Sequence, residues 1–328
     1  MFVADQRAKL VDLSPDLEPF VDAAAAFVAG GKRLRPQFCY AGWLVAGGDP
    51  DETGILAAAA SFEWLQASAL AHDDLIDGSD TRRGKPSVHR AFEARHRDLN
   101  NVGDAAQFGR SAALLLGDLM LSWSDEMFRN CGLDNIDAGA NYLDLCKTEV
   151  VAGQYLDVVG QTRPEFSVAE AMRVVRFKSA KYTIERPLHV GAALAGTDDE
   201  LLASLSVFGL PLGEAFQLRD DLLGVFGDPE VTGKPAGDDL REGKRTVLIA
   251  RTAERTDDAG RELLRRGLGN DEHIDQLREL IISTGADVAV EEDIASLERQ
   301  AETALEALDE SAQIHLHDLM LKATRRSR

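Results

Sequence analysis

The feature that most constrains the fold is a long apolar helical pattern that ends in carboxylates and is followed at once by cations. Small and apolar residues run from Ile55 to Ala71 with helical spacing, and Asp73 and Asp77 follow four residues apart. On a helix both carboxylates lie on one face, one turn apart. Hard divalent cations such as Mg²⁺ are often held by one or two carboxylates together with substrate phosphates. Arg82, Arg83, Gly84 and Lys85 come next, and guanidinium groups match phosphate oxygens in bidentate geometry.

A second stretch far downstream repeats this layout. Asp220 and Asp221 lie within another long apolar helical pattern, Leu201–Phe226. The segment after it contains further charges: Lys234, Asp238, Asp239, Lys244 and Arg245. Two helices that each present carboxylates followed by cations can hold one metal–diphosphate cluster between them. Alternatively, both acidic stretches could be exposed helix ends whose charges are solvated. The repetition of the whole layout disfavours this interpretation.

Helical spacing extends along most of the chain and predicts an all-α fold. We find no strand-like alternation, no repeat at solenoid periods and no glycine loop of the nucleotide-binding type. Pro187 lies inside the predicted helix 168–195 and should kink it, because proline lacks a backbone donor. Further helices are expected at 17–28, 38–46, 51–72, 89–96, 107–128 and 135–159.

The composition indicates which binding partners and which cellular compartment to expect. The 328 residues carry a net charge of −20, which argues against non-specific binding to nucleic acid or anionic membranes. Three cysteines without ligand spacing are typical of a reducing compartment. The longest uncharged run, Leu201 to Gly213, has 13 residues, too few to span a bilayer. No signal peptide is evident, so we expect a cytoplasmic protein without a transmembrane segment.

Three motifs in order give the chain a specific resemblance. GGKRLRP at Gly30–Pro36, DDLIDGSDTRRG at Asp73–Gly84 and FQLRDDLLG at Phe216–Gly224 resemble those of the trans-isoprenyl diphosphate synthases, or polyprenyl synthetases. The resemblance implies the isoprenoid synthase fold, a large helical bundle around a central cavity, in one domain over residues 1–328. An N-terminal arm of about 1–17 and a basic tail of about 322–328 complete it. The tail is either disordered or closes over the site.

The same resemblance implies the site and its ligands. The substrates are isopentenyl diphosphate and an allylic diphosphate, and the cofactor is Mg²⁺, with three ions per site. The metal ligands implied are Asp73, Asp77 and Asp220, supported by Asp74 and Asp221. Residues implied at the allylic diphosphate are Arg82, Lys178, Ser179 and Lys234, and those at isopentenyl diphosphate are Lys32, Arg35, Gln66 and Arg83. Gln217 and Lys244 are further substrate-binding candidates. Family members form homodimers.

One position departs from the family pattern. Gly224 stands where the second motif usually has its third aspartate, so one carboxylate is missing there. Asp228, one turn further on, could compensate only through water. The first motif is intact, and we expect activity to survive.

Product length in this family follows the bulk just below the first motif. Ser68 and Ala69 lie five and four residues before Asp73 and leave room for chain growth, while Trp64 and Leu65 lie one turn deeper. We therefore expect geranylgeranyl diphosphate, with farnesyl or longer products as alternatives. A class I terpene cyclase would need a different second metal motif and no GGKRLRP. A non-catalytic partner subunit is favoured only by Gly224.

Overall fold

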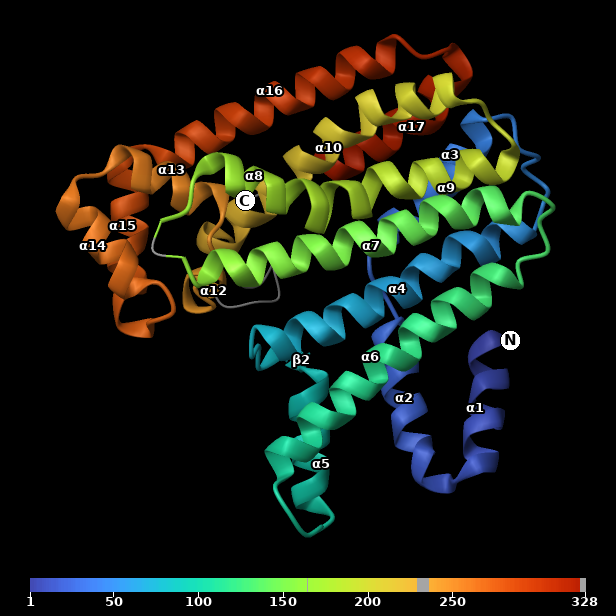
Figure 1. The fold of residues 1–328 in the computed structure, drawn as a ribbon, viewed down its shortest axis with the longest axis horizontal. Helices are drawn as coiled ribbons and strands as arrows, with labels where there is room; N and C mark the ends of the chain where they lie inside the picture. The colour runs from blue at the N-terminus through green and yellow to red at the C-terminus, as the bar shows by residue number, and fades with distance from the viewer. Residues whose placement is uncertain (164, 229–235, 325–328) are drawn as a thin grey trace. The chain divides into compact units, whose positions relative to one another are not determined.

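A computed structural model describes residues 1–163, 165–228 and 236–324. Contacts between residues divide the chain into two compact units, each described here by itself. One comprises Met1–Pro36 and Thr53–Gly132, and the other comprises Gln37–Glu52 and the chain from Leu133 onward. Within the described ranges the predicted all-α architecture is confirmed (Figure 1). The exception is a hairpin of two-residue strands, β1 (Thr81–Arg82) and β2 (Lys85–Pro86).

The first unit is built on two long helices. Its elements are α1 (Phe2–Leu13), the 3₁₀ turn η1 (Pro15–Leu17), α2 (Glu18–Phe27), α4 (Gly54–Ile76), the hairpin, α5 (Val88–Asp98) and α6 (Ala105–Arg129). The alanine-rich α4 packs along α6, and α5 packs on α6 as well (Figure 1). Trp64 of α4 and Trp123 of α6 meet edge to face with ring centroids 5.0 Å apart, and Phe2 of α1 packs on both rings.

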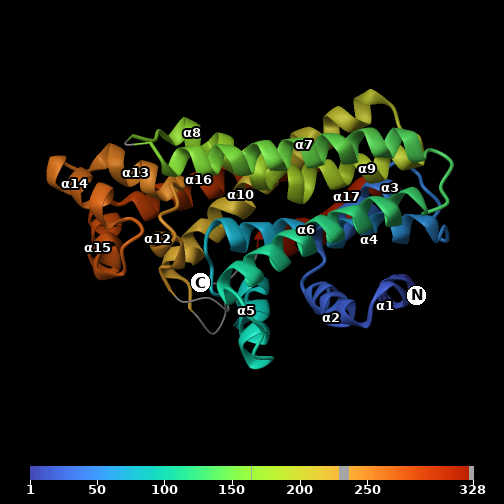
Figure 2. The same cartoon turned by 60° about the horizontal axis from the view of Figure 1, so that its bottom comes forward.

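The second unit surrounds α10 (Asp199–Phe226). Helix α10 packs against the π-helical segment η2 (Val175–Glu185) and α16 (Ala286–Glu306), and α7 (Ile136–Gln161) runs along η2 and α9 (Arg186–Ala195) (Figures 1 and 2). The other elements are α8 (Val168–Val174), α12 (Asp238–Arg241), α13 (Val247–Arg255), α14 (Asp258–Gly267), η3 (Asp271–His273), α15 (Ile274–Thr284) and α17 (Glu310–Thr324). Helix α3 (Leu34–Val45) begins in the first unit and continues into this one.

Close packing in the second unit depends on two glycines. A Cβ atom on Gly42 of α3 would lie 2.1 Å from the Leu188 carbonyl oxygen, and one on Gly191 of α9 would lie 1.8 Å from the Cys39 carbonyl oxygen. Each glycine therefore receives the backbone of the opposite helix. Only a residue without a side chain allows this approach.

The predicted helix 168–195 is three elements. Helix α8 passes into the π-helical η2, and α9 begins at Arg186 with Pro187 in its first turn. Because Pro187 has no backbone N–H to donate, the irregular backbone lies in the residues just before it. π-Helical segments occur frequently at functional sites, and this one contains Lys178 and Ser179.

Among the described residues, α10 is the one helix long and apolar enough to cross a membrane. More than half of its most apolar window is buried inside the protein. Core helices of soluble proteins share this length and composition, and α10 packs as such a helix.

Candidate active site

The first acidic motif lies at the C-terminal end of α4. The helix ends at Ile76, and the Asp77 N–H donates to the Asp73 carbonyl oxygen at 2.8 Å, so the two residues are one turn apart as predicted. Asp74 has a fully buried side chain, and its Oδ1 accepts a hydrogen bond from Arg82 Nε at 2.8 Å. Arg82 also lies 3.7 Å from Asp73 Oδ2. Its charge therefore offsets the repulsion between these two acids.

The hairpin after α4 directs the two arginines to different places. Arg83 and Gly84, at its turn, both have positive φ, which is the requirement of a type I′ hairpin turn. While Arg82 reaches the acids, the Arg83 guanidinium lies over Gly31, where a Cβ atom would be 3.4 Å from Nη2. The hairpin thus joins the first acidic motif to the basic turn of residues 30–36.

That basic turn is held by one of its own cations. Arg33 has a positive φ, and its guanidinium bonds to Glu63 of α4 and to the Val28 carbonyl oxygen. Glu63 lies one helical turn before Gln66. Three predicted isopentenyl diphosphate elements therefore share the first unit: the turn with Lys32 and Arg35, the α4 turn with Gln66, and Arg83. Lys32 is exposed, and Arg35 is half-buried at the start of α3.

Helix α7 contributes an acid that the sequence analysis did not single out. Lys178 Nζ of η2 donates to Asp157 Oδ2 at 2.6 Å. One turn earlier on α7, a Cβ atom on Gly153 would lie 2.3 Å from the Lys178 backbone nitrogen, so the glycine lets η2 approach closely. The available signal was that Asp157, four residues after a glycine, is the one charged residue in the stretch Val150–Gly160.

The second acidic motif lies near the C-terminal end of α10. Asp220 is half-buried and Asp221 is buried. Gln217 Nε2 donates to Asp221 Oδ1 at 2.8 Å. The pKa of Asp221 is raised to about 7, chiefly by burial and then by the charges of Asp239 and Asp157, while the hydrogen bond from Gln217 and the charge of Lys244 oppose the rise. The carboxylates of Asp239 and Asp157 disfavour a further negative charge at Asp221, and a bound cation would relieve this repulsion.

Lys244, a predicted substrate-binding residue, lies beside the same acids. Its Nζ is 3.5 Å from Asp239 Oδ1 and 2.5 Å from Glu242 Oε2. Ser179 is half-buried in η2. The predicted residue Lys234 and the last four residues of the basic tail lie outside the described residues. At the start of the tail, Lys322 Nζ contacts Gln37 Oε1 at 3.2 Å.

The donor set suits a Mg²⁺ ion that also binds phosphate. Among the described residues, no three His, Cys, Asp or Glu side chains are close enough to hold an ion by themselves. Each acidic motif instead offers one or two carboxylates, the usual protein share of a Mg²⁺ site that substrate phosphates complete. That both motifs hold the same diphosphate stays a prediction, because they lie in different units.

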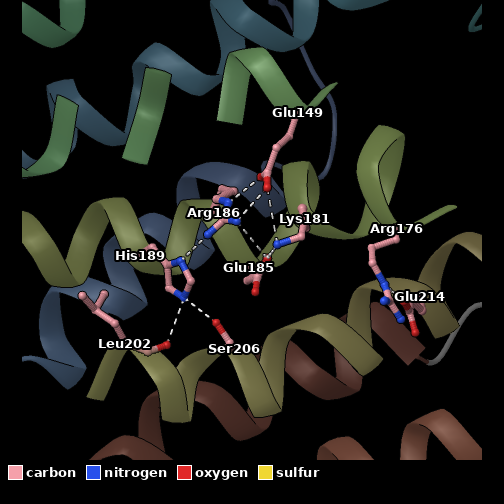
Figure 3. A network of polar contacts seen from close by, with 9 residues as sticks. All are labelled: Glu149, Arg176, Lys181, Glu185, Arg186, His189, Leu202, Ser206 and Glu214. Atoms are coloured by element: carbon pink, nitrogen blue, oxygen red, sulfur yellow. Dashed lines mark hydrogen bonds and ion pairs between the residues drawn. The ribbon is translucent and has the colours of Figure 1, made fainter. Parts of the chain in front are cut away.

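A buried polar network ties α7, η2, α9 and α10 together (Figure 3). Arg186 donates to both carboxylate oxygens of Glu149, at 2.6 and 2.8 Å. Lys181 donates to Glu185 Oε2 at 2.8 Å. Arg186 Nη1 also contacts His189 Nδ1 at 2.9 Å, which leaves the proton of neutral His189 on Nε2, 3.0 Å from the Leu202 carbonyl oxygen.

The proposed chain-length residues all lie on α4 in the first unit. Ser68 and Leu65 are buried, and Ala69 is half-buried one turn before Asp73. Trp64 packs against Trp123 and Phe2. The nearby His72 contacts the Leu114 carbonyl oxygen and lies 3.6 Å from Asp118 Oδ1.

Known proteins are similar to this chain in sequence. The sequence model described as polyprenyl synthetase matches residues 18–283. A short chain isoprenyl diphosphate synthase of Methanothermobacter thermautotrophicus is 30% identical over 94% of this chain and 90% of its own. A (2E,6E)-farnesyl diphosphate synthase of Mycobacterium tuberculosis is 33% identical over 71% of this chain, and the match spans 60% of that protein.

Solved structures are similar to this chain as well. The crystal structure of a geranylgeranyl pyrophosphate synthase from Corynebacterium glutamicum, complexed with isoprenyl diphosphate and magnesium, is 42% identical with a TM-score of 0.95. The similarity covers 99% of this chain and 96% of that one. A geranylgeranyl pyrophosphate synthetase from Pyrococcus horikoshii is 26% identical with a TM-score of 0.82, over 99% and 95% of the two chains.

Proposed function

Since this chain belongs to the polyprenyl synthetase family, we propose that it is a prenyltransferase that joins isopentenyl diphosphate head-to-tail to an allylic diphosphate. The product is an all-trans prenyl diphosphate. The single observation that carries this proposal is the pair of carboxylate–cation groups, one at each acidic motif. Asp73 and Asp77 lie one turn apart beside Arg82, and Asp221 lies near Asp157 and Asp239, each of which contacts a lysine.

Stabilising the leaving group is the main chemical task. Cleavage of the allylic carbon–oxygen bond places negative charge on the departing diphosphate and positive charge on carbon, and fixed cations stabilise the former. Mg²⁺, which Asp73, Asp77 and Asp220 would hold, would supply Lewis-acid neutralisation of that charge. Three ions per site are proposed from the family resemblance alone.

The basic side chains bind and orient the two substrates. Arg82, Lys178 and Lys234 are assigned to the allylic diphosphate, with Ser179, Gln217 and Lys244 beside it. Lys32, Arg35, Gln66 and Arg83 are assigned to isopentenyl diphosphate, whose double bond attacks the cationic carbon. The released diphosphate accepts the proton that the product loses, so no side-chain nucleophile is required.

The first test replaces the proposed metal ligands. Asp73→Ala and Asp220→Ala should each lower condensation by about 10²-fold or more, because they remove stabilisation of the leaving group. Asp258→Ala is the matched control, since the Asp258 side chain is fully exposed. Product formation with Mg²⁺ and labelled isopentenyl diphosphate gives the rates, and circular dichroism verifies folding. Unchanged turnover in either active-site variant would refute the role of these carboxylates.

We propose geranylgeranyl diphosphate as the product. Ser68 and Ala69 offer little bulk below Asp73, which favours growth beyond geranyl. The protein should be incubated separately with dimethylallyl, geranyl and farnesyl diphosphates, and the products sized. A ladder that ends at geranylgeranyl is expected. Products that end at farnesyl, or that grow much longer, would refute the argument from Ser68 and Ala69 but not the chemistry.

Two alternative functions would give different products in this incubation with allylic diphosphates. A class I terpene cyclase would release a hydrocarbon or alcohol and would not need the basic turn at residues 30–36. A non-catalytic partner subunit would form no product alone, and Gly224 is the feature that favours it. A homodimer is proposed from the resemblance and a cytoplasmic location from the cysteine pattern, and sedimentation velocity would test the dimer.

A further inference from the structure

Three residues on one face of α7 lie against the π-helical segment η2. Glu149, Gly153 and Asp157 follow one another at intervals of four residues, so they form one stripe along the helix, a turn apart. A Cβ atom on Gly153 would lie 2.3 Å from the Lys178 backbone nitrogen, so the two backbones approach closely at this glycine. A carboxylate therefore lies one turn to either side of the close approach.

Each carboxylate of the stripe binds a cation of the opposite segment. Asp157 accepts a hydrogen bond from Lys178 at 2.6 Å. Glu149 binds two cations: Arg186 donates to both of its carboxylate oxygens, at 2.6 and 2.8 Å, and Lys181 Nζ lies 3.5 Å from its Oε1 (Figure 3). The segment η2 is thus fixed to α7 at Lys178 and again at its C-terminal end.

The contacts at Glu149 are enclosed by the protein. The side chains of Glu149, Lys181 and Arg186 are 14%, 13% and 9% exposed, and Lys181 also donates to Glu185 Oε2 at 2.8 Å. In this group two acids balance two cations. Removal of the Glu149 charge would leave two buried cations with one acid, which strongly disfavours the present arrangement.

The segment η2 is π-helical over eleven residues. π-Helices occur mostly as single turns within α-helices, and their hydrogen bonds span five residues where those of an α-helix span four. If η2 relaxed toward α-helical geometry, Lys178 and Ser179 would rotate relative to Arg186 at its end. The direction of the Lys178 side chain therefore depends on the contacts that hold the other end of the segment.

We propose that Glu149 is a positioning residue for the allylic diphosphate. It binds Lys181 and Arg186 and thereby keeps η2 in the geometry that directs Lys178 to the substrate. Glu149 itself lies eight residues before Asp157 on α7, which is about 12 Å along the helix axis, so it acts through η2 and not by contact with the substrate. The inference deepens the proposed function and rests on the assignment of Lys178 made there.

The test measures binding of geranyl S-thiolodiphosphate by calorimetry with excess Mg²⁺. The carbon–sulfur bond of this allylic analogue resists ionisation, so no turnover is needed. Glu149→Gln keeps the size of the side chain and removes its charge. It should bind the analogue about tenfold more weakly than the wild type, the effect of losing one charge-assisted hydrogen bond. Wild-type affinity in a folded Glu149→Gln variant would overturn the proposal.

A double-variant cycle separates positioning from a general loss of structure. Lys178→Ala alone should weaken binding of the analogue. If Glu149 acts through Lys178, adding Glu149→Gln to Lys178→Ala should weaken binding by less than about twofold, because the group being positioned is already gone. A merely structural role would lower the affinity by the same factor in both backgrounds, and that result would overturn the proposal.

Asp293→Asn is the matched control. Asp293 of α16 accepts hydrogen bonds from Arg251 of α13 at 2.9 and 3.1 Å, so this variant also breaks an ion pair between two helices of the same unit. It should bind the analogue like the wild type. A loss of affinity as large as that of Glu149→Gln would mean that any broken ion pair has this effect, and would overturn the proposal.

Lys181→Met is a second variant that leaves the Glu149–Arg186 pair in place. It decides the question if circular dichroism shows that Glu149→Gln does not fold. It should also weaken binding of the analogue, and by less than about twofold in the Lys178→Ala background. In that case, wild-type affinity in Lys181→Met would overturn the proposal.

Failure of the proposed function gives a different result. If the wild-type protein does not bind the analogue, the allylic diphosphate site is refuted, and the role of Glu149 with it. If the wild-type protein binds the analogue but forms no prenyl product, only the condensing activity is refuted. The comparison of the variants then still measures the role of Glu149.

Discussion

Neighbouring aspartates in the two acidic motifs have different environments. Successive residues on a helix point about 100° apart, so the members of each pair face different surroundings. Asp74 is fully buried against Arg82, whereas Asp73 keeps some exposure. Asp221 is buried beside Gln217, whereas Asp220 is half-buried. In both pairs one carboxylate is tied into the protein and the other is more accessible to a ligand.

His189 should make stability sensitive to acid. Burial lowers its pKa from 6.5 to about 4. Below pH 6.5 the unfolded chain takes up a proton that the folded protein excludes. The free energy of unfolding should therefore fall by about 1.4 kcal/mol per pH unit between about pH 6.5 and 4. Above pH 6.5 this contribution is fully present, because the imidazole is neutral in both states.

Urea unfolding between pH 7.5 and 4.5 measures this contribution. The variant His189→Gln should lose less stability on acidification than the wild type. His317→Gln is the control, because His317 is exposed at the protein surface, and it should behave like the wild type. If His189→Gln and the wild type have the same pH dependence, His189 is not the group responsible.

At the scale of the elements, the π-helical segment η2 is held by its neighbours on both sides. Within η2, Lys178 bonds to Asp157 of α7. Arg186, the residue directly after η2, bonds to Glu149, which lies two turns before Asp157 on α7. His189 connects α9 to α10 through the Leu202 carbonyl oxygen and Ser206. Charged pairs buried between helices thus fix a backbone geometry that helical propensity alone would not select.

Breaking the Glu149–Arg186 pair should be costly. Their side chains are only 14% and 9% exposed, and removing one partner of a buried ion pair costs about 3–5 kcal/mol. Glu149→Gln should lower the free energy of unfolding by that order in urea. Asp144→Asn on the same helix breaks an ion pair with Lys147 in which Asp144 is 72% exposed, and should cost at most about 1 kcal/mol. Equal losses in both variants would contradict the structural role of the network.

At the scale of the whole molecule, the net charge of −20 coexists with sites for anionic substrates. Several cations of the proposed sites, such as Arg82 and Lys178, are paired with carboxylates. We therefore expect that binding of diphosphate depends on a few placed groups, because the overall field of a protein with this net charge repels anions.

The charge predicts weak attraction to anionic surfaces. In about 0.1 M salt, where the screening length is about 10 Å, the protein should stay in the supernatant when vesicles containing phosphatidylserine are sedimented. Phosphatidylcholine vesicles are the control and should behave in the same way. Selective sedimentation with the anionic vesicles would mean that a basic surface outweighs the net charge.

The sequence predicted the fold class and the first acidic motif well, because both depend on local spacing. Helical periodicity and the four-residue separation of Asp73 and Asp77 are properties of one helix, and the structure has them as expected. Pro187 likewise predicted that the helix would be irregular, but not that the irregular segment would be π-helical. The two short strands were not predicted, since a hairpin of this length shows no alternation.

By itself the sequence determined the helical fold class and the one-turn spacing of Asp73 and Asp77, and it predicted which residues could bind a metal and a diphosphate, because these depend on residue type and on spacing along a helix. Only the tertiary structure decided that Asp157 meets Lys178, and that Asp239 lies over Gly224. These partners are 21 and 15 residues apart and lie on different elements. No local periodicity relates them, and the packing of α7, η2, α10 and α12 brings them together.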